Sequence, residues 1–422
     1  MTQAKLCGEI LVEDMTSQEK ERAQRIQEIL PELRAVSADS DKKGAFNLAN
    51  LELFKSNGLT GLLVPKEYGG LGGGLRDLTA ACFALGTVCP STALCFFFHC
   101  STSSRGLLAL DAIAAELFNK EEVPLVKSFA QKILFRMGKE KCWFSNFASE
   151  FVKSEKAAVT ISTTARKVAG GYLLNGVKSF GCSTGVSDFY LLTAQLEGYS
   201  DAAGLATFMV PRLSTGVKER HKWDSIGMRA TATHGITLTD VFVPAEEALT
   251  LPSAFTKMMS MSRGSFVGNQ IAGNAVYLGK AFDVYEHTIS QLCARKFQDT
   301  GRCIGESPMH QEIVGKMAQN LETAMLWLRR QLQLETSEPP LLPKEEVIKN
   351  WRLCKGTVAD AAFEIAVAAL KAGGTSVTQN TSIEARALRD LSMGLVQAFP
   401  SERGRLEAAK MIIAKEKQTL FC

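Results

Sequence analysis

The sequence predicts an α+β protein of several domains, in the order helical, β, helical. Over the first 140 residues the apolar positions repeat at the helical period of about 3.6. Between Trp143 and Pro252 the period changes to 2, and beyond Pro252 the helical period returns. A chain of 422 residues suits two or three domains of roughly 100–200 residues each. We therefore expect domains at residues 1–140, 141–252 and 253–422.

The N-terminal domain is predicted to consist of helices interrupted by one loop. Apolar residues recur at helical spacing over residues 18–33, and the next helix should end at Asn57-Gly58. Glycines crowd residues 69–74, and such a run cannot continue a helix. Helical patterns resume over residues 75–86 and 91–110. Because the second of these is apolar almost all round, it should be buried.

The middle segment reads as an all-β domain of roughly 100 residues, large enough for a barrel or sandwich. Alternating or β-branched runs predict strands at 159–163, 172–180, 189–196, 205–210 and 235–243. Within the second run, Asn175-Gly176 predicts a tight hairpin turn. In the last domain, apolar residues from Ile313 to Leu332 lie on one helical face, and further helices are expected at 353–370 and 406–413.

Composition excludes several classes of function. Hydrophobic residues make up 46% and charged residues 22%, as in ordinary globular proteins rather than disordered ones. The net charge is only +4 and no basic run stands out, so a nucleic-acid partner is not expected. No long apolar stretch or signal-peptide pattern occurs, which predicts a cytoplasmic protein without a membrane span. The 11 cysteines and 5 histidines are dispersed without a C-x-x-C pair, so no metal site is expected.

Familiar catalytic motifs are missing from the sequence. It contains no G-x-S-x-G, no phosphate-binding G-x-x-x-x-G-K-[ST] and no H-E-x-x-H. The glycine loop at 69–74 follows a predicted helix rather than a strand, so it does not meet the requirement of a Rossmann fingerprint.

What does stand out is a set of strings in a fixed order along nearly the whole chain. They are LLVPKEYGGLGG at 62–73, GGYLLNGVKSF at 170–180, WDSIGMRAT at 223–231, DVFVP at 240–244, Gly373-Gly374 and Arg389-Asp390. In this combination the sequence resembles the acyl-CoA dehydrogenase family of flavoproteins. The resemblance implies an N-terminal α-helical domain, a middle β-barrel domain and a C-terminal four-helix bundle. It also implies FAD bound between the last two domains and across a subunit interface, hence a homodimer or homotetramer.

The resemblance implies flavin contacts from the middle domain. Ser149 and Glu150 stand at the family's Thr-Glu-Pro segment, with Phe151 in place of the proline, and the hydroxyl of Ser149 could bond the flavin edge. In the string at 178–182, Phe180 would form an aromatic wall against the isoalloxazine ring. Cys182 stands where the family presents a threonine to the flavin.

In the C-terminal domain the resemblance implies four more cofactor residues. Arg295 matches the arginine that reaches FAD across the dimer, and Gln311 belongs to the family's His-Gln pair. Gly373 and Gly374 match the glycine pair whose backbone closely approaches the dinucleotide.

The catalytic base is harder to place. Dehydrogenating an acyl thioester requires a carboxylate that removes the α-proton while a hydride passes to the flavin. Counting from the motifs, Ala398 and Ser262 occupy the two positions of the family's glutamate, and neither can act as the base. Glu402, four residues beyond Ala398, would have to reach in; the alternative is a surface glutamate.

Flavin monooxygenases that share this fold also lack the base, and some carry a histidine in the buried N-terminal helix, where His99 lies. His99 could stabilise an oxygenated flavin or take a proton, or it could be a core histidine. Three functions therefore stay open. The first is dehydrogenation of an acyl-CoA or carrier-protein-bound acyl group, with an electron acceptor. The second is a monooxygenase supplied by a flavin reductase, and the third is a catalytically silent family member.

Overall fold

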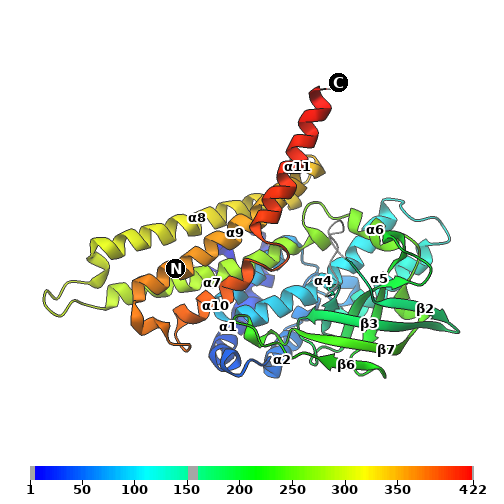
Figure 1. Ribbon diagram of the computed structural model, residues 1–422, viewed down its shortest axis with the longest axis horizontal. Coiled ribbons are helices and arrows are strands. Elements are labelled where there is room, and N and C mark those ends of the chain that lie inside the picture. Colours follow the sequence, from blue (N-terminus) through cyan, green and yellow to red (C-terminus); the bar gives the residue numbers. More distant parts are fainter. Residues whose placement is uncertain (1–4, 151–159, 421–422) are drawn as a thin grey trace.

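The computed structural model describes residues 5–150 and 160–420, and the elements form three regions in chain order (Figure 1). The N-terminal helices are α1 (Ser17–Lys43), α2 (Leu48–Ser56), α3 (Leu75–Val88), α4 (Pro90–Ala114) and α5 (Val123–Gly138). Thr16 and Glu19 cap the start of α1 reciprocally, and Gly44 ends it at a φ of 61°. Helix α4 is buried over most of its length, as its apolar sequence predicts.

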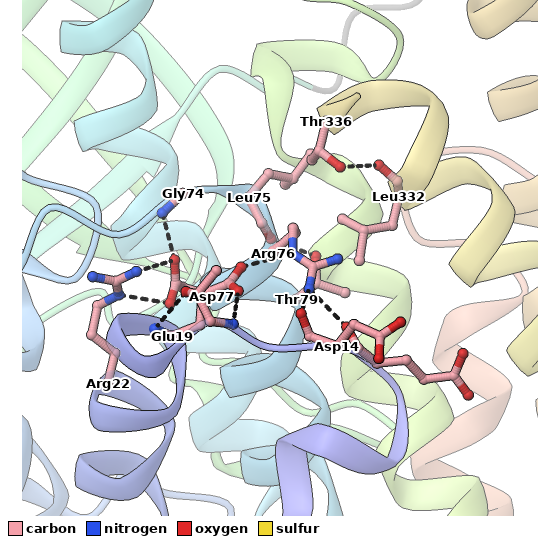
Figure 2. A network of polar contacts seen from close by, with 12 residues as sticks. Asp14, Glu19, Arg22, Gly74, Leu75, Arg76, Asp77, Thr79, Leu332 and Thr336 are labelled. Carbon is pink, nitrogen blue, oxygen red and sulfur yellow. Dashed lines mark hydrogen bonds and ion pairs between the residues drawn. The ribbon is translucent and has the colours of Figure 1, made fainter. Parts of the chain in front are cut away.

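The glycine loop is clamped against α1 by a polar network (Figure 2). Asp77 accepts hydrogen bonds from the Gly74 backbone N–H at 2.8 Å and from Arg22 Nε at 2.6 Å. One turn away, Arg76 Nε donates to Glu19 at 2.7 Å. Two charged pairs thus join α1 to the first turn of α3, directly after the glycine loop.

The middle region is one eight-stranded sheet. Its strands are β1 (Phe144–Phe147), β2 (Thr164–Val168), β3 (Gly171–Gly181), β4 (Phe189–Leu196), β5 (Leu205–Pro211), β6 (Val217–Arg220), β7 (His234–Pro244) and β8 (Ala248–Leu249). The strand order is β6-β7-β3-β2-β4-β5-β8, with β1 paired in parallel to β4. One face of the sheet buries its own apolar cluster, and the other packs against α4, α5 and α6 (Ala254–Ser260).

Two details of the predicted strands are wrong. Asn175-Gly176 forms no turn, because β3 continues through both residues. Gly176 lies at a β-bulge with a φ of 153°. Only glycine fits there, since a Cβ would lie 2.7 Å from the Thr163 Cα. The chain reverses instead at Gly170, whose φ is 78°. Of the strand expected at 159–163, residue 159 lies outside the described residues, and β2 begins only at Thr164.

The C-terminal region is helical. Helices α7 (Gln270–Ala294), α8 (Pro308–Thr336), α9 (Lys344–Gly373) and α10 (Ile383–Gly394) pack together, while α11 (Ser401–Leu420) projects from the body (Figure 1). Helix α3 lies along α7 at very short range, because a Cβ on Gly86 would lie 2.4 Å from Val276 O and one on Gly279 2.1 Å from Phe83 O. One apolar core therefore spans the first and last regions. In the described part of the chain, no helix combines the length and apolarity needed to cross a bilayer.

Candidate functional site

The end of β3 carries two of the residues expected to face a cofactor. Phe180 is 40% exposed, and its ring lies edge-on to Trp223 with centroids 5.4 Å apart. Cys182 follows the end of β3, is 6% exposed, and places its Sγ 3.1 Å from Thr233 Oγ1. The β3 end and the 223–233 segment thus form one corner, with an accessible aromatic ring and a nearly buried thiol.

The 223–231 segment is held in place by α10. Met228 N–H donates to Asp390 Oδ1 at 2.7 Å, and Trp223 Nε1 donates to Met228 O at 3.0 Å. Only glycine fits at Gly227, since a Cβ there would lie 2.0 Å from Arg389 O. The strings WDSIGMRAT and Arg389-Asp390, distant in sequence, therefore meet. Burial raises the pKa of Asp390 above its ordinary value.

Sequence reasoning missed the group that holds Arg389. The carboxylate of Asp41, near the end of α1, pairs with Arg389 Nη2 at 2.6 Å. In the sequence Asp41 looks like an ordinary polar residue near the end of a surface helix, so no local signal identifies its role. The ion pair ties the N-terminal helix to α10, beside the docked segment.

Ser149 follows β1 at the border of the described residues, and Phe151 lies outside them. Ser149 is exposed, and its carbonyl accepts a hydrogen bond from the Ser179 N–H at 3.1 Å. Next to it, Glu150 and Lys178 form a buried ion pair at 2.6 Å. Burial lowers the pKa of Lys178 to about 8, although Glu150 opposes the change. This pair anchors β3 to the end of β1 beneath Ser149.

A second group of expected cofactor residues meets in a cavity of about 310 Å³ between α7, α9 and α10. Its lining includes His287, Gln291, Arg295, Gly373, Val377 and Glu384. Gly374 adopts a φ of 68° and has open space where a Cβ would be. Gln311 lies in the exposed first turn of α8 and is not among the lining residues.

Helix α10 links the cavity to the β3 corner. Glu384 in its first turn lines the cavity, and Asp390 binds Met228. Six residues of helix separate them, or about 9 Å along the axis. Within the cavity wall, His287 Nε2 lies 3.4 Å from Glu384 Oε1.

His99 is fully buried in α4, with both ring nitrogens bonded to backbone. Its Nε2 lies 2.9 Å from Thr60 O and its Nδ1 accepts the Phe144 N–H at 3.0 Å. A carbonyl can only accept, so the neutral ring carries its proton on Nε2. The ring also stacks on Trp143 at 4.3 Å, and burial lowers the pKa of His99 to about 4. No nitrogen is left for a substrate or cofactor, which favours the core role.

The positions of the family's base carry no carboxylate. Ala398 lies between α10 and α11 with a φ of 65°, and the Ser262 hydroxyl donates to Ser265 O. Glu402 lies in the first turn of α11, its side chain 74% exposed and paired with Arg405 at 2.9 Å. These contacts are those of a surface glutamate.

One buried carboxyl does lie close to Ser262, and sequence reasoning missed it. Glu335, at the end of α8, is 5% exposed and accepts hydrogen bonds from Ser265 N–H at 3.1 Å, Ser265 Oγ at 2.8 Å and Gln331 Nε2 at 2.8 Å. Burial raises the pKa of Glu335. These bonds occupy both oxygens, so the group fastens the α6–α7 connection rather than facing open space.

Comparison with known proteins gives matches to two family models. Residues 16–110 match the acyl-CoA dehydrogenase N-terminal domain, and residues 148–241 match the acyl-CoA dehydrogenase middle domain. Cyclohex-1-ene-1-carbonyl-CoA dehydrogenase of Syntrophus aciditrophicus is 24% identical over 96% of this chain and 91% of its own length. Dibenzothiophene monooxygenase of Rhodococcus erythropolis is 28% identical, but over 59% of this chain and 56% of its own.

Among solved structures, butyryl-CoA dehydrogenase from Megasphaera elsdenii superposes with a TM-score of 0.79 at 18% identity, covering 95% of this chain and 99% of that one. The fold of the whole described chain is therefore that of an acyl-CoA dehydrogenase. The relatives that this chain resembles thus include a dehydrogenase and a monooxygenase. Two segments of this chain thus match the N-terminal and middle-domain models of the acyl-CoA dehydrogenase family, and the C-terminal helical region completes the same fold.

Proposed function

We propose that this protein is a flavin-dependent oxidoreductase that binds FAD at the β3 corner. The observation that carries the proposal is the exposed Phe180 ring beside Trp223, on a segment docked to α10. The residues fit the cofactor: Phe180 offers a flat apolar wall, and the Cys182 thiol and Ser149 hydroxyl offer polar contacts at its edge. When bound, the flavin supplies the hydride or electron transfer that no side chain can perform.

The cavity at Arg295 and Gly373 fits the diphosphate part of FAD. Arg295 brings a positive charge for a diphosphate, and the glycine pair leaves the backbone approachable. Following the family resemblance, we propose that this cavity serves the flavin of a second copy, so that the active protein is a homodimer or homotetramer. Light scattering of the purified protein with and without Arg295→Gln tests this, and a wild-type monomer that retains flavin would contradict it.

Purified protein should show the absorbance bands of oxidised flavin, which lie at about 350–500 nm. Phe180→Ala should lower flavin retention, because it removes the aromatic wall. A matched control is Phe242→Ala, which removes another exposed aromatic ring from the middle sheet. A colourless protein that takes up no added FAD would support the catalytically silent alternative instead.

The first candidate reaction is α,β-dehydrogenation of an acyl-CoA, or of an acyl group on a carrier protein, with electrons passed to a separate acceptor. The relative matched over almost the whole chain is an acyl-CoA dehydrogenase, which supports this candidate. It requires a base, and Glu402 would serve only if a rearrangement brought it to the flavin. Glu402→Gln should then abolish anaerobic bleaching of bound flavin by acyl-CoA, while Glu312→Gln, an exposed control, should not.

The second candidate is a monooxygenase that uses O₂ and reduced flavin delivered by a reductase. Ala398 and Ser262 at the two base positions favour it, since oxygenation does not call for a carboxylate there. Of the two reactions, the residue types at these two positions favour this one. Formation of an oxygenated substrate on mixing the protein with chemically reduced flavin, O₂ and a substrate panel tests it, because free reduced flavin consumes O₂ without the protein; failure to bind reduced flavin would refute it. We also propose a cytoplasmic location, which cell fractionation tests.

A further inference from the structure

Arg105 is a buried cation without an anion. It lies on α4, is 3% exposed, and has no carboxylate within ion-pair distance in the part of the chain that the structure describes. Among the described residues, its side chain makes one hydrogen bond, from Nη1 to Thr193 Oγ1 at 3.5 Å, and its Nε has no partner there. The ring of Phe255 on α6 lies 5.9 Å from the guanidinium carbon, at the outer limit of a cation–π contact.

The side chains around Arg105 include further unpaired hydroxyls. Thr193 on β4 is directly opposite Thr207 on β5, so both side chains share the face of the sheet that meets α4. Within residues 5–150 and 160–420, Thr207 Oγ1 is buried without a partner, and so is Thr102 Oγ1, three residues before Arg105 on the same side of α4. On the far side of Thr193, Lys178 Nζ bonds the Thr193 carbonyl, and its charge is already matched by Glu150.

This arrangement calls for a ligand on physical grounds. A buried charge is costly unless it is paired and hydrogen-bonded, and a buried hydroxyl without a partner adds to that cost. Burial lowers the pKa of Arg105 only to about 10, so the group stays charged at neutral pH. Arginine presents several N–H donors in a plane that matches the oxygens of carboxylate and phosphate groups.

We propose that Arg105, Thr193 and Thr207, with Thr102 beside them, form a binding site for an oxyanion: the carboxylate or phosphate group of a small-molecule ligand. The site lies on α4 ten residues beyond Cys95, whose thiol bonds Thr231 O at the docked segment. Ten helical residues correspond to about 15 Å. The oxyanion site therefore lies away from Cys95, although Thr193 also joins it to Lys178 and Glu150 beneath Ser149. Its test measures anion binding and does not depend on the proposed flavin chemistry.

The site can be tested by thermal unfolding of the purified full-length protein. Sodium phosphate or sodium acetate is titrated in place of sodium chloride at constant ionic strength. The unfolding midpoint should rise in a saturable manner with at least one of the two, because a ligand that binds only the folded state stabilises it. A response to phosphate alone assigns a phosphate group, and a response to acetate alone assigns a carboxylate.

Arg105→Met should remove the saturable rise. The control Arg302→Met, at an exposed arginine paired with Glu306, should keep it. Thr207→Val should leave the midpoint in chloride unchanged, because the Thr207 hydroxyl has no hydrogen-bond partner among the described residues, and should raise the half-saturating anion concentration several-fold.

A wild-type protein without a saturable rise in either anion overturns the proposal, as does an Arg105→Met variant that keeps the rise. If Arg105→Met does not fold, Thr207→Val decides: a titration curve identical to that of the wild type overturns the site. If Thr207→Val lowers the unfolding midpoint to the same extent with and without anion, the threonine has a packing role, and this result would also refute the proposal.

Discussion

At low pH, protonation of His99 should lower the stability of the folded protein. The size of this one contribution can be worked out from the structure. Burial lowers the pKa of His99 from its ordinary value of 6.5 to about 4. The unfolded chain therefore takes up a proton more readily than the folded protein. The stabilising contribution of neutral His99 is complete above about pH 6.5 and is lost as the pH falls towards 4.

The size of the effect follows from the two pKa values. Each pKa unit corresponds to 1.36 kcal/mol, so the full loss is about 3 kcal/mol below pH 4, and about 2 kcal/mol is lost at pH 5. Two backbone hydrogen bonds and the stacking on Trp143 enforce the neutral ring, because a protonated Nδ1 would face the Phe144 N–H.

Urea unfolding of wild type and His99→Gln, in the same flavin state, at about pH 7.5 and about pH 5 measures this contribution. Glutamine keeps one donor and one acceptor but does not titrate, so the variant reports the pH dependence of all other groups. The wild type should lose about 2 kcal/mol more than the variant over this range. Equal losses would refute the assignment of His99 as a neutral core group and reopen its role at the flavin.

Three further changes test the site. Gly227→Ala should destabilise the protein by about 1–3 kcal/mol in urea unfolding, since the added Cβ collides with Arg389 O; an unchanged midpoint would contradict the docking of this segment. Lys178→Met leaves the buried Glu150 carboxylate without its cation and should cost about 3–5 kcal/mol by the same assay; a loss below about 1 kcal/mol would contradict the role of this pair as a buried anchor. Gly373→Ala should weaken flavin binding in equilibrium dialysis, because its Cβ would lie 2.4 Å from Val377 Cγ2; unaltered affinity would remove this cavity from the cofactor site.

Periodicity predicted the order of helical and β regions well, because amphipathic patterns report which face of an element is buried. It failed where glycine has more than one use. Asn175-Gly176 has the composition of a hairpin turn, yet Gly176 is needed for its close approach to Thr163. A local pattern cannot tell a turn from a bulge, since both exploit the missing side chain.

The candidate site divides in the same way. Its motif residues could be named from sequence, and the structure brings Phe180 beside Trp223 and Arg295 beside Gly373. It does not add Gln311 to that cavity, and whether these residues bind flavin stays a prediction.

By itself, the sequence determined the fold family, the neutral balance of charge and the absence of a glutamate at positions 262 and 398, because these depend only on residue type and order. The tertiary structure decided what the polar residues do. His99, Glu335 and Arg105 all lie in helices, and the sequence around them does not distinguish their roles. Packing satisfies His99 and Glu335 with hydrogen bonds, and it leaves Arg105 without an anion among the residues that the structure describes. Burial and partners come from residues far away in the chain, and they set the protonation and availability of each group.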